Sequence, residues 1–316
     1  MKENTVFVFP GQGVQYVGMC KDIFRQFAVA RHTFEHVSDL VHRDIGRICF
    51  YGPDAQLNNP ENTSLATFAH SVSIAHVLQA ECGRPLYNIA DAMVGHSMGQ
   101  YSALYCVGSM KFDDAVSVLA ARSNYMSLAS TGGAGMIVII GLPKDVVESF
   151  LRTSQRYGYA EFANFNSRDQ FVISGQNAAL NMILDMATSN GAKIARRLNV
   201  AVPAHCDLMA KAGVMLREKL EHINMSAPKA TWFSNQTATP MQHVRDIKNS
   251  LIDQMTSGVH WLEIMENFPQ YNITRAYELG PGRVLTRLIC RANVGVRAMH
   301  TDVLSNVRSM ISELQR

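Results

Sequence analysis

The motif that most constrains the fold of this chain is Gly95-His96-Ser97-Met98-Gly99, between a short apolar run and a helix-forming segment. A strand that turns sharply into a helix at a GxSxG motif is typical of a nucleophile elbow, which lifts a serine hydroxyl above the sheet edge. Glycine fits on both sides of the serine because this turn brings two backbones close together. The motif therefore predicts an α/β fold with Ser97 as a nucleophile; a plain turn is the alternative.

The position of Ser97 at the start of a helix also predicts an oxyanion site. The first N–H groups of a helix have no partner within the helix, and the helix dipole favours negative charge there. We expect the backbone N–H of Met98 to be one donor. The Pro/Gly-rich loop after the apolar strand 6–9 could supply a second donor, the Gln12 N–H, or could be only a tight turn.

Length and composition indicate an ordinary globular protein. Of the 316 residues, 47% are hydrophobic and 17% are charged, and no apolar run approaches the ~20 residues of a membrane span. The N-terminus runs directly into a strand without a secretory pattern, so we expect a cytoplasmic protein. The net charge of +3 is too small for a general nucleic-acid-binding protein but allows a local basic surface for an acidic partner.

The cysteines give no sign of a disulfide framework or a metal site. The six residues are scattered along the chain without CxxC spacing: Cys20, Cys49, Cys82, Cys106, Cys206 and Cys290. This pattern is typical of reduced thiols.

The middle of the chain predicts a separate small subdomain. The hydrophobic pattern indicates strands at 136–140, 160–165, 170–174 and 193–198, with helices at 144–157 and 180–189. This βαββαβ order is that of the ferredoxin-like fold. We therefore predict an α/β-hydrolase-like catalytic subdomain formed by residues 1–132 and 200–316, with a ferredoxin-like subdomain inserted at 133–199.

Arg122 falls on the apolar face of a helix predicted from 112 to about 129. A guanidinium in such a place cannot lose its charge and needs an anionic partner, yet no local carboxylate stands out. The partner is therefore either a distant Asp or Glu or the carboxylate of a substrate, held through a bidentate pair. The second alternative would make Ser97 the nucleophile for an acidic acyl group.

His205 is the best candidate for a base among the eleven histidines. It lies where a proline-marked loop enters a helix, and it follows Ser97 in the chain, which is the order of α/β-hydrolase-type sites. Asp207 is too close in sequence to reach the same ring, so no acidic third member stands out. Asn164 and Asn166 could line the same cleft, although turn chemistry would also explain them.

A basic helix face follows the turn Gly280-Pro281-Gly282. Arg283, Arg287 and Arg291 recur there at helical spacing. Together with Lys193, Arg196 and Arg197 they could dock an acidic protein, and a solvated charged face is the alternative.

Together these motifs resemble the malonyl-CoA:acyl-carrier-protein transacylase family, which includes free-standing acyltransferases of polyketide synthases. The resemblance covers nearly the whole chain and rests on six blocks in the same order: FPGQGVQ at 9–15, GHSMG at 95–99, Arg122, NFNS at 164–167, VPAHC at 202–206 and ELGPGRVL at 278–285.

The resemblance implies a ping-pong transfer of a malonyl group from malonyl-CoA to the phosphopantetheine thiol of an acyl carrier protein, in fatty-acid or polyketide biosynthesis. CoA is then a substrate and no cofactor is needed. The resemblance implies that Ser97 is the nucleophile, that His205 is the base, and that the backbone N–H groups of Gln12 and Met98 bind the oxyanion. It also implies that Arg122 binds the substrate carboxylate, that Asn166 binds the substrate, and that the backbone carbonyl of His260 orients the base. We expect a monomer without nucleic-acid or membrane partners.

Three positions depart from the family pattern. Gln100 replaces a glutamate, Ala66-Thr67-Phe68 replaces a TQP stretch, and Ala204 replaces a common serine. These changes leave the acyl group open between malonyl, methylmalonyl and others. A proofreading thioester hydrolase and a silent carrier-docking scaffold are the alternatives; Arg122 argues against the hydrolase, and the intact serine and histidine argue against the scaffold.

Overall fold

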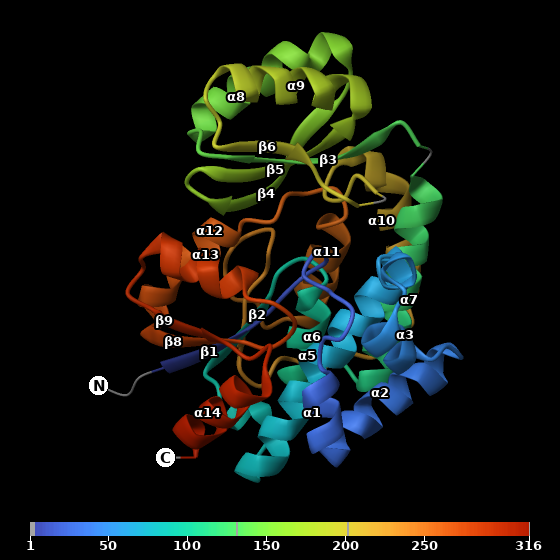
Figure 1. Cartoon of the computed structure of the whole chain (residues 1–316), viewed down its shortest axis with the longest axis vertical. Helices are drawn as coiled ribbons and strands as arrows, with labels where there is room; N and C mark the ends of the chain where they lie inside the picture. The colour runs from blue at the N-terminus through green and yellow to red at the C-terminus, as the bar shows by residue number, and fades with distance from the viewer. Residues whose placement is uncertain (1–3, 131, 201, 316) are drawn as a thin grey trace.

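The computed structural model describes residues 4–130, 132–200 and 202–315, and it has two subdomains, each built on its own sheet (Figure 1). The larger sheet has the strand order β7-β2-β1-β8-β9 and is parallel, and the smaller one is antiparallel with the order β4-β5-β3-β6. The predicted α/β fold with two subdomains is confirmed.

The centre of the large sheet brings two loops of the predicted site together. β1 (Asn4–Phe9) pairs in parallel with β2 (Ala92–Gly95), and Phe9 lies opposite Gly95 at the carboxyl ends of both strands. The loops that follow these strands therefore start side by side. The remaining strands of this sheet are β8 (Ile273–Glu278), β7 (Thr231–Trp232) and β9 (Arg297–His300).

Both faces of the large sheet are buried, as is usual for a parallel sheet. Alternate residues of β1 point to opposite faces: Phe7 and Phe9 belong to one apolar cluster, and Val6 and Val8 to another. The second cluster contains side chains from α12 (Trp261–Asn267), η4 (Phe268–Tyr271) and α13 (Val284–Ala292).

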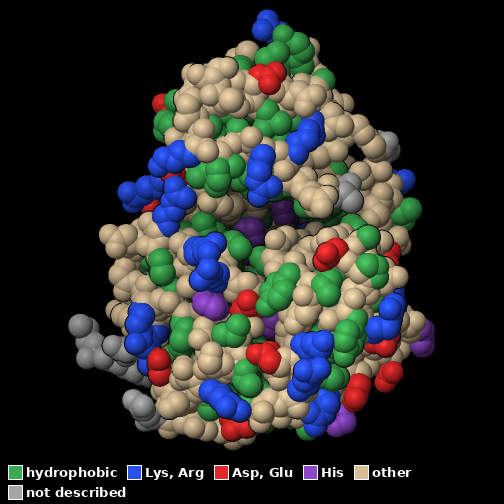
Figure 2. Space-filling model, in the orientation of Figure 1, with side chains coloured by type: hydrophobic (Ala, Val, Ile, Leu, Met, Phe, Trp, Pro, Cys, Tyr) green, Lys and Arg blue, Asp and Glu red, His purple; other side chains and the backbone are tan. Residues whose placement is uncertain are grey.

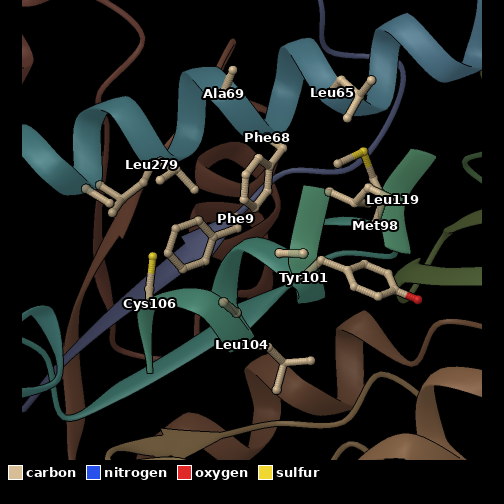
Figure 3. Close-up of a cluster of buried hydrophobic side chains, with 14 of the residues drawn as sticks. Phe9, Leu65, Phe68, Ala69, Met98, Tyr101, Leu104, Cys106, Leu119 and Leu279 are labelled. Atoms are coloured by element: carbon tan, nitrogen blue, oxygen red, sulfur yellow. The ribbon is translucent and has the colours of Figure 1, made fainter. Parts of the chain in front are cut away.

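The first cluster is much larger, and Figure 3 shows the part where Phe9 lies near side chains of α5, α6 and α7. It draws on α1 (Lys21–Gln26), α2 (Ala28–Val41), α3 (Ile45–Tyr51), α4 (Asp54–Leu57), α5 (Pro60–Cys82), η1 (Leu86–Asn88), α6 (Gly99–Cys106), α7 (Phe112–Ala129), η3 (Asp207–Met209), α10 (Ala210–Glu221), α11 (Val244–Asp253) and α14 (Leu304–Leu314).

The small subdomain has the strand order expected of a ferredoxin-like fold. One face of its sheet packs on its two helices, and the other face contributes Met136, Val138 and Val172 to the large cluster below. Its elements are β3 (Ala134–Ile140), α8 (Lys144–Ser154), η2 (Gln155–Tyr157), β4 (Ala160–Ser167), β5 (Gln170–Gln176), α9 (Asn177–Ser189) and β6 (Ile194–Arg197). All lie within 133–199; the predicted outer ends at residues 1 and 316 lie outside the described residues.

None of the helices in the described part of the chain is both long enough and apolar enough to cross a bilayer.

Candidate active site

A cavity of about 490 Å³ lies between the two subdomains and contains most of the predicted site. Its floor is formed by the loops after β1 and β2, its roof by β3 to β6, and one side by α13. Figure 2 shows this hollow with histidine side chains in its depth and lysine and arginine side chains around its mouth. A larger cavity of about 1150 Å³ lies at the opposite edge of the large sheet, beside Thr5, Asp91 and Thr231, and includes neither Ser97 nor His205.

The elbow has the close backbone packing that its glycines predicted. A Cβ atom at Gly95 would lie 1.9 Å from the carbonyl carbon of Gly99, and one at Gly99 would lie 2.2 Å from the carbonyl oxygen of Phe9. Ser97 itself has a φ of 52°, a left-handed conformation that a residue with a side chain rarely adopts. The turn therefore holds the Ser97 side chain in a strained, fixed position.

Ser97 and His205 are in direct contact although 108 residues separate them in the chain. The distance from Ser97 Oγ to His205 Nε2 is 2.8 Å. His205 is 3% exposed. Burial and, to a smaller extent, the charge of Arg122 lower the pKa of His205 to about 3. The imidazole is therefore neutral at physiological pH, the form that can accept the serine proton.

The carbonyl that orients His205 belongs to Gln254, so the prediction of the His260 carbonyl is wrong. His205 Nδ1 lies 2.8 Å from the Gln254 carbonyl oxygen, just after α11. The carbonyl of His260 instead accepts from the N–H of Ile264 in the first turn of α12. The His260 ring stacks on Phe165, and its Nδ1 atom contacts the Glu263 carboxylate, so the side chain stabilises the start of α12.

Two buried carboxamides behind the elbow were not predicted. Asn235 Oδ1 accepts from the Ser97 N–H at 2.7 Å and from Gln254 Nε2 at 2.9 Å. Both residues are at most 1% exposed. They lie 138 and 157 residues after Ser97 and outside any sequence motif of the site, so only the contacts in the structure show that they belong to it.

The two predicted oxyanion donors are backbone N–H groups in the loops that follow β1 and β2. Those of Gln12 and Met98 have no hydrogen-bond partner among the described residues, whereas the N–H of Ser97 is taken by Asn235. The Gln12 side chain donates to the Pro60 carbonyl and to Ser64 Oγ, which fixes its loop on α5. The geometry is compatible with the predicted oxyanion site.

Arg122 lies in the core beside the site rather than in the cavity wall. It is 2% exposed on α7, and its Nε and Nη2 atoms have no hydrogen-bond partner in the described part of the chain. Burial lowers the pKa of Arg122, although a guanidinium keeps its charge in proteins. Of the two predicted alternatives, a distant Asp or Glu is not found among the described residues, so the guanidinium still needs an anion.

Asn166 lines the cavity and contacts the residue before the nucleophile. Its Oδ1 lies 3.0 Å from His96 Nε2, and Asn164 Nδ2 lies 3.5 Å from the same atom. Both asparagines and His96 line the cavity. Burial is the main cause that lowers the pKa of His96, so this ring is neutral as well.

Two of the departures from the family pattern lie next to the site. Gln100 is fully buried, and its Oε1 accepts from the Asn235 N–H at 3.1 Å while its Nε2 has no partner among the described residues. Ala204 directly precedes His205, and its carbonyl accepts from Ser174 Oγ, which joins the His205 loop to β5. The third departure lies in α5, where the hydroxyl of Thr67 is buried without a partner in the described part of the chain.

The basic face predicted on α13 lies at the mouth of the cavity, because Val284, Leu285 and Leu288 of that helix line it. Arg283 and Arg287 are exposed and have no ion-pair partner among the described residues, whereas Arg291 pairs with Asp169. In the small subdomain Arg196 lines the cavity and Arg197 bonds to Asn177 and Asn181.

The six cysteines are free thiols, and no group of three or more His, Cys, Asp or Glu side chains in the described ranges is placed to bind a metal ion.

Comparison with known proteins identifies the family. Residues 6–276 match the acyl transferase domain. The malonyl CoA-acyl carrier protein transacylase of Haemophilus influenzae is 34% identical over 309 residues, which are 98% of each chain. Its counterpart from Escherichia coli is also 34% identical, over 311 residues and 98% of each chain.

Solved structures agree over the whole fold. The acyl-carrier-protein S-malonyltransferase of Bartonella henselae has a TM-score of 0.95 at 31% identity and covers 99% of this chain and 100% of its own. A malonyl-transacylase solved in complex with a type II polyketide synthase acyl-carrier protein has a TM-score of 0.94 at 32% identity, covering 98% and 100%. The chain therefore belongs to the acyl transferase family and is an acyltransferase similar to the malonyl CoA-acyl carrier protein transacylases, as its sequence motifs predicted.

Proposed function

We propose that this enzyme moves a malonyl group from malonyl-CoA to the phosphopantetheine thiol of an acyl carrier protein, through an acyl ester on Ser97. The observation that carries the proposal is the 2.8 Å contact between Ser97 Oγ and His205 Nε2 at the floor of the cavity. The names of the relatives, and the relative solved with its carrier protein, support the choice of substrates.

In the first half of the cycle Ser97 Oγ attacks the thioester carbonyl while His205 Nε2 takes the hydroxyl proton. The backbone N–H groups of Gln12 and Met98 bind the oxyanion. The carbon–sulfur bond then breaks, and the CoA sulfur leaves with the proton from His205. In the second half the carrier thiol gives its proton to His205 and attacks the ester, and the proton returns to Ser97 Oγ as the carbon–oxygen bond breaks.

Selection of the acyl group falls to Arg122 and Asn166 in this proposal. The guanidinium of Arg122, whose Nε and Nη2 have no partner among the described residues, binds the malonyl carboxylate, and neutral acyl groups would leave that buried charge unpaired. Asn166 Oδ1 is taken by His96, which leaves its N–H groups to face the substrate.

The transfer between two thiols is redox-neutral and uses only the groups named above, so we propose an enzyme without a metal or redox cofactor. The free cysteines support a cytoplasmic location, and the proposed site draws on one chain only, which fits a monomer. The pathway, fatty-acid or polyketide, depends on which carrier protein accepts the acyl group.

Intact-protein mass after incubation with malonyl-CoA tests the proposal. We expect an adduct of malonyl mass on the wild-type protein and none on Ser97→Ala. A wild-type protein that stays unmodified, or a Ser97→Ala variant that is modified equally, would refute the proposal. Adding a loaded or free carrier protein and scoring transfer and release separately distinguishes a transferase from a proofreading hydrolase.

A further inference from the structure

The side chain of Asn235 lies behind the Ser97–His205 pair and forms hydrogen bonds to the backbone on both sides of residue 96. Asn235 is fully buried in the loop after β7. Its Nδ2 donates to the Gly95 carbonyl at 2.7 Å, and its Oδ1 accepts from the Ser97 N–H at 2.7 Å. These two bonds bracket residue 96, so the side chain of Asn235 pairs with the turn as a neighbouring strand would.

The bond from Asn235 to the Ser97 N–H holds a residue whose backbone is strained. The left-handed backbone conformation of Ser97, with φ of 52°, is strained for a residue with a side chain and persists only where its surroundings fix it. The bonds from Asn235 are buried, where a hydrogen bond is stronger than in water. Asn235 is therefore placed to hold the serine backbone in the conformation that presents Oγ to His205.

The Asn235 side chain also bonds to Gln254, the residue whose backbone carbonyl orients His205. Asn235 Oδ1 accepts a second bond, from Gln254 Nε2 at 2.9 Å, and the Gln254 carbonyl accepts from His205 Nδ1 at 2.8 Å. With the contact of 2.8 Å between His205 Nε2 and Ser97 Oγ, these bonds close a ring through four residues. A shift of Asn235 would therefore move the nucleophile and the carbonyl behind the base together.

Asn235 is itself held at its backbone. Its N–H donates to Gln100 Oε1 at 3.1 Å, and its carbonyl accepts from the N–H of His260 at 2.9 Å. Two neighbouring elements, the elbow helix α6 and the start of α12, thus fix the position of the carboxamide. A buried polar group with this many bonds has little freedom to relax.

We propose that Asn235 is a positioning residue, which sets the distance between Ser97 Oγ and His205 Nε2 by holding the nucleophile's backbone and the base's carbonyl partner in one hydrogen-bonded ring. It touches neither the substrate nor the reacting atoms. The inference rests on the proposed function, because its readout is acylation of Ser97.

The test compares Asn235→Ala with Asn306→Ala. Asn306 of α14 also donates a side-chain bond to a backbone carbonyl, that of His300, and neither residue lines the cavity. Rapid quench with malonyl-CoA gives the acylation rate, steady-state assays give kcat and KM, and urea unfolding gives stability. We expect Asn235→Ala to lower acylation and kcat about 100-fold with KM within about two-fold, since small misplacements of reacting groups cost this much. Asn306→Ala should acylate within about two-fold of wild type.

Gln254→Met provides a second variant that keeps side-chain volume and the carbonyl to His205 but loses the bond to Asn235. We expect the acylation rate of Gln254→Met to fall about 10-fold. If Asn235→Ala does not fold, this variant tests whether the bond between Asn235 and Gln254 positions the reacting groups. In a His205→Ala background the loss of Asn235 should change the residual rate less than about three-fold, because no base remains to be misplaced.

Three results would overturn the inference: acylation of Asn235→Ala within about three-fold of wild type, Gln254→Met acylating as fast as wild type, or an equal loss with and without His205. If the wild-type protein forms no malonyl adduct, it is the proposed function that fails. If wild type and Asn235→Ala acylate alike, only the role of Asn235 fails.

Discussion

The Nδ1 atom of His205 lies 2.8 Å from the backbone carbonyl oxygen of Gln254. A carbonyl oxygen can only accept a hydrogen bond, so this contact places the ring proton on Nδ1 and leaves Nε2 as the acceptor that faces Ser97. Many serine enzymes use a carboxylate in this place, which also stabilises the imidazolium. A neutral carbonyl orients the ring without adding a negative charge, and its hydrogen bond raises the pKa of His205 by less than burial lowers it.

The first prediction concerns the pH dependence of acylation. Because the pKa of His205 is lowered to about 3, the imidazole stays neutral well below the usual histidine range. We expect the rate of Ser97 acylation by malonyl-CoA, measured by rapid quench, to change less than about two-fold between about pH 8 and pH 5. A histidine with the ordinary pKa of about 6.5 would lose about 30-fold over this range. An acid limb centred near that value, in protein shown by circular dichroism to be folded, would contradict the prediction.

The second prediction separates substrate selection from stability at Arg122. Arg122→Met removes a buried charge whose Nε and Nη2 atoms have no partner in the described part of the chain. Replacing such a charge by an apolar side chain of similar length should raise the free energy of unfolding by about 1 to 3 kcal/mol. The same change should lower kcat/KM for malonyl-CoA by about 100- to 1000-fold, because the bond to the carboxylate is lost.

Urea unfolding and acylation assays with malonyl-CoA and acetyl-CoA check both parts. Arg152→Met on α8, where the arginine is exposed, is the matched control and should change neither quantity. Equal losses for malonyl-CoA and acetyl-CoA would show that Arg122 does not recognise the carboxylate. Since the charge of Arg122 also lowers the pKa of His205, the acid limb of acetyl transfer should move to higher pH in Arg122→Met.

The third prediction concerns the basic surface at the mouth of the cavity. Arg287 is exposed on α13, whose Leu285 and Leu288 line the cavity. Arg287→Glu reverses one charge where an acidic carrier protein would approach, so we expect transfer to the carrier to slow about 5- to 10-fold, more at low salt. Acylation by malonyl-CoA alone should stay within about two-fold. Arg308→Glu, on α14, is the control; equal effects of both variants on transfer would exclude a local docking surface.

The parts of the site that the sequence predicted are those with a local signal. Ser97 lies in a GxSxG motif, whose Gly95 is required by the backbone of Gly99 in the same turn. His205 lies in a proline-marked loop beside a helix. The ferredoxin-like order was predictable because each element shows its own hydrophobic period. Even there the ends differ: the helix predicted at 180–189 begins at Asn177, three residues earlier.

The residues that hold Ser97 and His205 in place could not be predicted from a local sequence pattern. The partner of His205 is a backbone carbonyl, which every residue has, and its choice depends on the path of the chain after α11. His260 was the wrong residue because its carbonyl is used to start α12. Asn235 bonds to groups more than a hundred residues away, at Gly95 and Ser97, and no local pattern marks such a contact.

The fourth prediction concerns His70, a histidine that the proposed mechanism does not use. It lies in α5, is fully buried, and neither ring nitrogen has a hydrogen-bond partner in the described part of the chain. An unpaired buried polar group costs about 1 to 3 kcal/mol. We therefore expect His70→Leu, which is similar in size and apolar, to raise the free energy of unfolding at pH 7 by about this amount, as measured with urea.

Acidification should enlarge this gain. Burial lowers the pKa of His70 to about 3 in the folded protein, while the unfolded chain keeps a value of about 6.5. Between these values the unfolded state binds more protons, so the contribution of His70 to stability falls as the pH drops from about 6.5 towards 3. His76 on the same helix is the matched control, because its ring bonds to Thr33 and Tyr105. His76→Leu should destabilise the protein at pH 7, since it removes the bond to the Tyr105 hydroxyl and one of the two bonds of the Thr33 hydroxyl, which also donates to the Val29 carbonyl. If His70→Leu also destabilises the protein, His70 has a partner and the prediction is wrong.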